Sequence, residues 1–190
     1  MHYATPRKAA VFLDRDGVIN LDTGYVGPIE DFVFLKGVKD ALALIKSKGY
    51  LTVLCTNQSG IARGRYTMAD FLRTTAYMQQ CLQLHDARID AVYCCPHHPE
   101  AQIEQYKKKC SCRKPLPGMF QKAVQELNID IKTSAAVGDR ARDLQGPRLL
   151  GVKNLALIAP ESEEKKQIPE ADVLESLFEF ALKLPPLALD

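Results

Sequence analysis

The sequence predicts an α/β protein of three layers, in which a parallel sheet carries helices on both faces. Two observations support this class: short apolar runs recur along the chain, and segments with apolar residues at helical spacing separate them. Strands that alternate with helices in this way pair in parallel, and the connecting helices cover both faces of the sheet. Because 190 residues are enough for one well-buried core, we expect residues 1–190 to form a single domain.

Five apolar runs are expected to form the strands. Each is short and continuously apolar, which is typical of strands buried on both faces. The five runs are Ala9–Leu13, Leu51–Cys55, Ile89–Cys95, Ala135–Val137 and Val152–Ile158.

Four segments carry helical signals. Gly49 ends the first, as glycine often does at helix C-termini, and Thr67 with Asp70 is typical of a helix N-terminus. Pro117 fits the first turn of the third helix. The expected helices are Val38–Lys48, Thr67 to about His85, Pro117 to about Asn128, and Val173–Lys183.

Three connections are notable for their length or charge. The mixed charges of Glu161–Lys166 favour a solvated loop before the last helix. The connections Asn20–Gly37 and Pro96–Gly118 are unusually long, and loops of that length are uncommon unless they are functional or internally braced.

The composition narrows the class of protein. A net charge of +2 gives no electrostatic reason to expect a nucleic acid or a membrane surface as a partner. The N-terminal residues lack an apolar stretch long enough for a signal peptide or a membrane span. Six cysteines without a secretory signal favour a reducing compartment, so we expect a cytoplasmic protein. Since the sequence has no clear oligomerisation segment, we expect a monomer.

The most informative motif is Asp14-Arg15-Asp16-Gly17, at the end of the first predicted strand. Its two carboxylates lie where the strand opens into a loop, and Gly17 supplies the backbone freedom that a tight exit needs. One carboxylate could attack a substrate while the other transfers protons. A solvated acidic loop is the alternative, and the motif alone does not decide between them.

Polar and cationic residues follow the second and third strands. The second strand leads into Thr56-Asn57-Gln58-Ser59-Gly60, whose hydroxyl, amide and backbone N–H groups could hold a phosphate as neutral donors. An ordinary polar turn is the alternative. The connection after the third strand contains Cys112-Arg113-Lys114-Pro115, which brings two cations before a helix or leaves them in a solvated basic loop.

Acidic residues follow the fourth strand. Asp139 could complete an oxygen-rich Mg²⁺ site with the side chain of Asp14 and the backbone carbonyl of Asp16, since Mg²⁺ is typically held by one or two carboxylates with phosphate and water. Asp143 is expected to support that site or a helix N-terminus, where the helix dipole favours negative charge. Parallel sheets bind ligands at the carboxyl ends of their strands, which is where all four motifs lie.

In chain order, these motifs resemble those of the haloacid dehalogenase (HAD) phosphohydrolase superfamily over residues 9–158. The resemblance implies a HAD-like Rossmannoid fold and a phosphoric monoester hydrolase. It makes Asp14 the nucleophile that forms an aspartyl-phosphate, and Asp16 the group that protonates the leaving oxygen and then activates water. Thr56 and Lys114 would stabilise the phosphoryl group. The Mg²⁺ ligands would be Asp14, Asp16 and Asp139.

A second constellation of cysteines and histidines lies at the end of the third predicted strand and in the long connection Pro96–Gly118 that follows it. Three thiolates and an imidazole form a good tetrahedral Zn²⁺ set, and four protein ligands leave no open position, so such an ion would brace the loop. Two unrelated thiol pairs or a disulfide are the alternatives. His98 rivals His97 as a ligand, and Cys94 rivals Cys95; Cys55 and Cys81 are expected in the core. The expected Zn²⁺ ligands are Cys95, His97, Cys110 and Cys112.

Longer strings resemble one family within the superfamily, the D-glycero-D-manno-heptose 1,7-bisphosphate phosphatases, and its relatives, the zinc-loop histidinol-phosphate phosphatases. The resemblance implies a minimal cap and removal of the C7 phosphate to give heptose 1-phosphate, in lipopolysaccharide and ADP-heptose biosynthesis. The strings are Asp14–Asn20, Gly24–Val26, Thr56–Gly64, Cys95–Pro99 and Cys112–Pro117. The expected substrate contacts are Asp22, Thr23, Gly24, Tyr25, Asn57, Gln58, Ser59, Arg113 and Arg140.

Two features depart from the family's pattern. Arg140 stands where members often carry a lysine, and a planar guanidinium binds differently from an ammonium. Gly146-Pro147 interrupts the expected helix, which is therefore predicted to start late, to kink or to lie after Pro147. Hydrolysis of histidinol phosphate and a non-catalytic, zinc-braced binding module are the alternatives to hydrolysis of a heptose bisphosphate.

Overall fold

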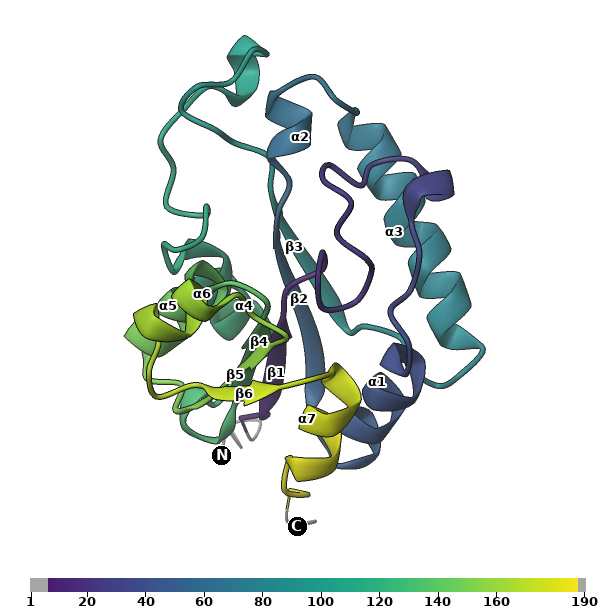
Figure 1. Cartoon of the computed structure of the whole chain (residues 1–190), viewed down its shortest axis with the longest axis vertical. Helices are drawn as coiled ribbons and strands as arrows, with labels where there is room; N and C mark the ends of the chain where they lie inside the picture. The colour runs from purple at the N-terminus through teal and green to yellow at the C-terminus, as the bar shows by residue number, and fades with distance from the viewer. Residues whose placement is uncertain (1–6, 188–190) are drawn as a thin grey trace, which may run out of the picture.

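The computed structural model describes residues 7–187 and confirms the predicted α/β class (Figure 1). Its sheet contains six strands in the order β3-β2-β1-β4-β5-β6, and every neighbouring pair is parallel. The first five strands confirm the predicted ones, with ends shifted by one or two residues. The strands are β1 (Ala10–Leu13), β2 (Leu51–Asn57), β3 (Ala91–Cys95), β4 (Ala135–Gly138), β5 (Asn154–Ile158) and β6 (Asp172–Leu174).

Helices cover both faces of the sheet (Figure 1). On one face lie α1 (Val38–Ser47), α3 (Met68–Gln83) and α7 (Leu177–Lys183). On the other face lie α4 (Gly118–Leu127) and α5 (Ala141–Leu150), with α6 (Ser162–Gln167) beside α5. The short helix α2 (Ser59–Ala62) follows β2. In the described residues, no helix is both long enough and apolar enough to cross a membrane.

The position of β1 between two layers of helices explains why its sequence is continuously apolar. Val11 and Leu13 pack into the core on the side of α1 and α3, whereas Ala10 and Phe12 pack into the core on the side of α4 and α5. All four side chains are buried. A strand with helices on both faces has no solvated side, so both sets of alternating residues are apolar.

The C-terminal part of the chain corrects two predictions. The charged run Glu161–Lys166, predicted as a loop, lies mostly within α6, which buries none of its residues and therefore has no apolar stripe in its sequence. The helix predicted over Val173–Lys183 begins only at Leu177. Its predicted start belongs to the edge strand β6, and Ser176 caps the helix by accepting from the backbone N–H of Glu179 at 3.1 Å.

Helix α5 rules out two of the three geometries predicted around Gly146-Pro147. It begins at Ala141 and runs through Gly146 and Pro147, so it neither starts late nor lies after Pro147. Gly146 lets α5 approach α4 closely, because a Cβ at this position would come within 2.7 Å of the Phe120 ring. Burial of Leu144 in the core on this side of the sheet helps to hold the helix despite the backbone hydrogen bond that Pro147 cannot donate.

Candidate active site

Three neighbouring strands bring the predicted catalytic residues together. β1 lies between β2 and β4 in the sheet. Asp14, directly after β1, therefore lies between Thr56 near the end of β2 and Asp139 directly after β4. The strand order changes direction here, and open parallel sheets bind ligands at such a point.

A buried lysine links two carboxylates at this edge. Lys114 Nζ lies 2.7 Å from Asp14 Oδ1 and 2.7 Å from Asp143 Oδ1, and all three residues are buried. Burial alone would lower the pKa of Lys114, but the two carboxylates outweigh burial and hold that pKa above its usual range. The ammonium is therefore charged, and it is placed to stabilise negative charge that develops beside Asp14.

The backbone of Lys114 is fixed by Asn57 at the end of β2. Asn57 Oδ1 accepts from the backbone N–H of Lys114 at 3.0 Å, and Asn57 Nδ2 donates to the backbone carbonyl of Lys114 at 3.1 Å. Both the oxygen and the nitrogen of this amide are therefore hydrogen-bonded to the backbone of Lys114. Asn57, predicted to contact substrate, lines the cavity described below while its amide positions Lys114.

Three carboxylates lie close enough together to share a cation. One oxygen each of Asp14, Asp139 and Asp143 can be chosen so that all lie within 4.8 Å of one another. Burial, together with the neighbouring carboxylates, raises the pKa of Asp14 to about 6 and that of Asp139 to about 8; Lys114 opposes the shift at Asp14. A divalent cation bound here would compensate the buried negative charge and relieve the repulsion among the carboxylates. The oxygen donors fit Mg²⁺, which prefers such ligands.

The second carboxylate of the first motif, Asp16, is held by three side chains. Its Oδ1 accepts from Arg15 Nε at 3.0 Å and from Asn20 Nδ2 at 2.9 Å, while its Oδ2 accepts from Gln58 Nε2 at 3.0 Å. Arg15 is buried and also donates to the backbone carbonyl of Val26. These bonds fix the direction in which the Asp16 carboxylate points.

The polar turn after β2 is more closely bound to the protein than its sequence suggests. Gln58 is buried, and its Nε2 also donates to Thr56 Oγ1 at 2.8 Å, while its Oε1 accepts from the hydroxyl of Tyr66. Gln58 was predicted to contact substrate, but its amide is occupied by these partners. Ser59, the first residue of α2, does face the cavity in front of Asp14.

A cavity of about 240 Å³ opens in front of these groups. The exposed turn after β1 contributes three of the predicted substrate contacts, whereas Thr23 in the same turn does not line the cavity. The residues that line the cavity are Asp14, Asp16, Asp22, Gly24, Tyr25, Asn57, Ser59, Gly60, Tyr66, Asp139 and Arg142.

Arg113 and Arg140, the two arginines predicted to contact substrate, do not line this cavity. Arg113 Nη1 donates to the backbone carbonyl of His97 at 3.3 Å. Arg140 Nε lies 3.5 Å from Asp139 Oδ2, so this guanidinium contacts a proposed metal ligand.

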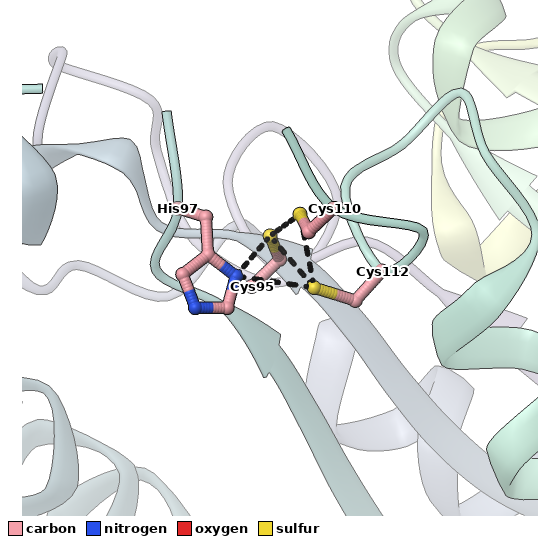
Figure 2. Close-up of side chains that lie close together, drawn as sticks. All are labelled: Cys95, His97, Cys110 and Cys112. Carbon is pink, nitrogen blue, oxygen red and sulfur yellow. Dashed lines mark hydrogen bonds between the residues drawn. The ribbon is translucent and has the colours of Figure 1, made fainter. Parts of the chain in front are cut away.

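The four predicted zinc ligands converge, although they come from two ends of a long loop. Figure 2 shows the side chains of Cys95, His97, Cys110 and Cys112 pointing toward one another. The three sulfur atoms lie 3.2 to 3.6 Å apart, and His97 Nδ1 lies 3.3 Å from Cys112 Sγ. Around a tetrahedral Zn²⁺ with Zn–S bonds of about 2.3 Å, sulfur atoms lie about 3.8 Å apart. The donor set suits a tetrahedral metal ion, around which the sulfur atoms would lie slightly farther apart than they do here.

The rival ligands lie outside this cluster. His98 Nε2 lies 3.2 Å from the Arg63 guanidinium, and His98 Nδ1 accepts from the backbone N–H of Glu100 at 3.1 Å. Cys94 packs beside a different small core, and burial raises the pKa of its thiol to about 12. All six cysteines are free thiols, so the disulfide alternative is wrong for residues 7–187.

Comparison with known proteins identifies the family to which the chain belongs. A model of the haloacid dehalogenase-like hydrolase family matches residues 7–151. The chain belongs to this family. A hydrolase from Photorhabdus laumondii named D-glycero-beta-D-manno-heptose-1,7-bisphosphate 7-phosphatase is 49% identical over 149 residues, which cover 78% of this chain and 79% of the relative. A relative of the same name from Haemophilus ducreyi is 47% identical over 180 residues, which cover 91% of this chain and 96% of the relative.

A solved structure of the same kind supports this placement within the haloacid dehalogenase-like hydrolases. The D,D-heptose 1,7-bisphosphate phosphatase from B. bronchiseptica, complexed with magnesium and phosphate, superposes with a TM-score of 0.81 at 32% identity. The match covers 93% of this chain and 97% of that one. The chain is therefore a member of the heptose-bisphosphate-phosphatase branch of the family.

Sequence reasoning missed several residues of this hydrolase's site. Arg15 lies inside the first motif and Asn20 just after it, but their hydrogen bonds to Asp16 are not evident from the sequence. Arg142 lies between the two aspartates of the fourth motif, a position that could have marked it as a cavity residue. No signal in the sequence points to Tyr66, which reaches the site only through the fold.

Proposed function

We propose that this phosphoric monoester hydrolase, with Mg²⁺, removes the C7 phosphate of D-glycero-β-D-manno-heptose 1,7-bisphosphate to give heptose 1-phosphate. The observation that carries the proposal is the buried pair of Asp14 and Lys114, at a cavity that also presents Asp16 and Asp139. The curated relatives support the substrate, and their names specify the β anomer. The product would enter lipopolysaccharide and ADP-heptose biosynthesis.

In the first step, an oxygen of Asp14 attacks the C7 phosphorus, and the bond from phosphorus to the sugar oxygen breaks. A proton from Asp16 goes to that oxygen, which leaves as the C7 hydroxyl. The step forms an aspartyl-phosphate on Asp14. Lys114 and the hydroxyl of Thr56 stabilise the charge on the phosphoryl oxygens, a contribution that dominates phosphoryl transfer.

In the second step, Asp16 takes a proton from a water molecule, whose oxygen attacks the same phosphorus. The bond between phosphorus and the Asp14 oxygen breaks, which restores the carboxylate and releases inorganic phosphate. Asp16 regains in this step the proton that it gave in the first, so one residue serves as acid and then as base.

The metal ligands of the proposal are the carboxylates of Asp14 and Asp139 and the backbone carbonyl of Asp16. Bound Mg²⁺ would supply positive charge between the nucleophile and the substrate phosphate, two anions that otherwise repel one another. Asp143 serves a different purpose: it pairs with Lys114 and accepts from the backbone N–H of Arg140 at 3.0 Å at the start of α5.

The Cys₃His cluster is proposed to hold a structural Zn²⁺. Four protein ligands leave no position for substrate or water, so the ion would brace the loop rather than take part in the reaction. Lys114 follows the last ligand, Cys112, by two residues, which makes the brace important for the site. Its backbone is held from the other side by Asn57.

We infer that one set of residues contacts the sugar and that three arginines contact its phosphate or hydroxyl groups. The sugar would lie against the turn Asp22–Tyr25 and Ser59, while Arg113, Arg140 and Arg142 would supply positive charge for phosphate or hydroxyl groups. A monomer in the cytoplasm is the form in which we expect the enzyme to act.

The test is to measure kcat/KM with Mg²⁺ on the β and α anomers of heptose 1,7-bisphosphate and on histidinol phosphate. We expect the β anomer to be preferred by a hundredfold or more, which corresponds to about 2.7 kcal/mol of differential transition-state stabilisation. A preference for histidinol phosphate would leave the fold and mechanism standing and overturn the substrate. Binding of the sugar without hydrolysis would favour the non-catalytic module instead.

A further inference from the structure

The Tyr66 hydroxyl and the Gln58 amide form a buried pair that the proposed reaction does not use directly. The hydroxyl donates to Gln58 Oε1, and both side chains are buried. At its other end, Gln58 Nε2 donates to Asp16 Oδ2 at 3.0 Å and to Thr56 Oγ1 at 2.8 Å. One amide therefore contacts both the proposed acid and a hydroxyl proposed to stabilise the phosphoryl group.

The direction in which this amide points decides what its two neighbours can do. With Nε2 toward Thr56, the threonine oxygen accepts a hydrogen bond, and its own proton is left to donate to a phosphoryl oxygen. With the amide reversed, Oε1 would accept that proton and would also face the Asp16 carboxylate. Two acceptors would then meet without a proton between them, which is unfavourable in a buried site. A hydroxyl that donates to Oε1 favours the first orientation.

Packing holds the Tyr66 ring in place independently of its hydroxyl. The ring lies in a small core with Ile61 and Phe71. It also lies directly against two glycines, since a Cβ added at Gly27 or at Gly60 would come within 2.2 Å of ring atoms. Replacing Tyr66 by phenylalanine therefore keeps the ring where it is and removes only the hydrogen bond.

We propose that Tyr66 is a positioning residue, whose hydroxyl fixes the Gln58 amide so that Asp16 is held for proton transfer and Thr56 donates to the phosphate. The inference rests on the proposed phosphatase function, in which Asp16 protonates the leaving oxygen. It extends that function to a residue that lines the cavity and whose hydroxyl acts on Asp16 and Thr56 through the Gln58 amide.

Two substrates separate positioning of the acid from a general structural effect. The C7 hydroxyl of a heptose leaves as a strong base and needs a proton from Asp16, whereas p-nitrophenolate leaves without one. We expect Tyr66→Phe to lower kcat/KM for heptose 1,7-bisphosphate about tenfold more than for p-nitrophenyl phosphate. Equal losses on the two substrates, or no loss on either, would overturn the proposal.

A double-mutant cycle tests whether the hydroxyl acts through the amide. In a Gln58→Met background, Tyr66→Phe should cause no further loss on heptose 1,7-bisphosphate, because the amide that it orients is gone. Additive losses would mean that the hydroxyl contacts the sugar itself, and they would overturn the positioning role.

Tyr93→Phe is the matched control. It removes a tyrosine hydroxyl that donates to Glu126 at 2.9 Å, outside the candidate site, and it should leave kcat/KM on both substrates unchanged. A wild-type protein inactive on both substrates would overturn the proposed function and this inference together. An active wild type with equal losses in Tyr66→Phe would overturn the role of Tyr66 alone.

Discussion

At the scale of single residues, the candidate site depends on one buried ammonium between two buried carboxylates. Lys114 Nζ lies 2.7 Å from an oxygen of Asp14 and from an oxygen of Asp143. Removing one partner of a buried ion pair leaves an uncompensated charge, which costs about 3 kcal/mol or more. We therefore expect Lys114→Met to lower the free energy of unfolding by about 3 kcal/mol in urea titrations at neutral pH.

The control for this variant is Lys132→Met, which removes an exposed lysine and should change stability by less than about 0.5 kcal/mol. Similar unfolding midpoints for the two variants would show that the buried ammonium does not hold the site together.

Because of Asp139, we expect the stability of the folded protein to depend on pH. Without Mg²⁺, burial and the neighbouring carboxylates raise its pKa from 3.8 to about 8. Between these values the folded protein keeps a proton that the unfolded chain has released, so stability falls as pH rises through the window. We expect Asp139→Asn to melt above the wild type in Mg²⁺-free buffer, by a margin that grows from about pH 5 to about pH 8.

Thermal melts at several pH values measure this margin. Added Mg²⁺ should raise the Tm of the wild type more than that of Asp139→Asn, because the variant lacks one of the carboxylates whose charge the ion compensates. A margin that stays constant with pH contradicts the account of Asp139.

The catalytic residues could be predicted to the extent that they adjoin strands. Asp14 and Asp139 were found because each directly follows an apolar strand, where chain order and sheet geometry place it at one edge. The bonds of Asn57 to Lys114 and of Tyr66 to Gln58 could not be predicted in this way. They depend on loop geometry after the strands, which no local spacing specifies.

At the scale of elements, the loop between β3 and α4 is the part that most needs a brace. It carries Cys110 and Cys112 directly before Arg113 and Lys114. We expect the purified protein to contain about one equivalent of zinc, and Cys110→Ser to lose it and to raise KM. Metal analysis by mass spectrometry and steady-state kinetics measure the two effects.

Cys81→Ser is the control, because Cys81 lies on α3 outside the metal cluster. It should keep the zinc and the kinetics of the wild type. A zinc-free protein with unchanged stability and kinetics would refute the proposed brace.

Two elements that the sequence did not predict, β6 and α6, lack a buried apolar pattern. β6 is three residues long and exposes two of them, and α6 buries none. Both form because they pack beside elements already in place, β5 and α5. By contrast, α3 confirms the helix predicted from Thr67 to about His85, because Thr67 and Asp70 form a reciprocal cap whose sequence signature is local.

At the scale of the whole molecule, the two cores share the strands of one sheet, since alternate residues of β1 enter each. Neither core can be lost without exposing the apolar residues of the same strands. We therefore expect residues 1–190 to unfold as one domain, in a single calorimetric transition whose calorimetric and van't Hoff enthalpies agree. Two resolved transitions would show that the halves of the sheet are separate units.

The central claim is that Asp14 attacks phosphorus and that the ends of the strands hold the groups that assist this step around it. The most direct measurement is inorganic phosphate release from heptose 1,7-bisphosphate with Mg²⁺, by the wild type and by Asp14→Asn, with circular dichroism to confirm that the variant is folded. We predict release of the C7 phosphate by the wild type and a loss on the order of 10⁴-fold or more in the folded variant. Full activity in Asp14→Asn would contradict the account.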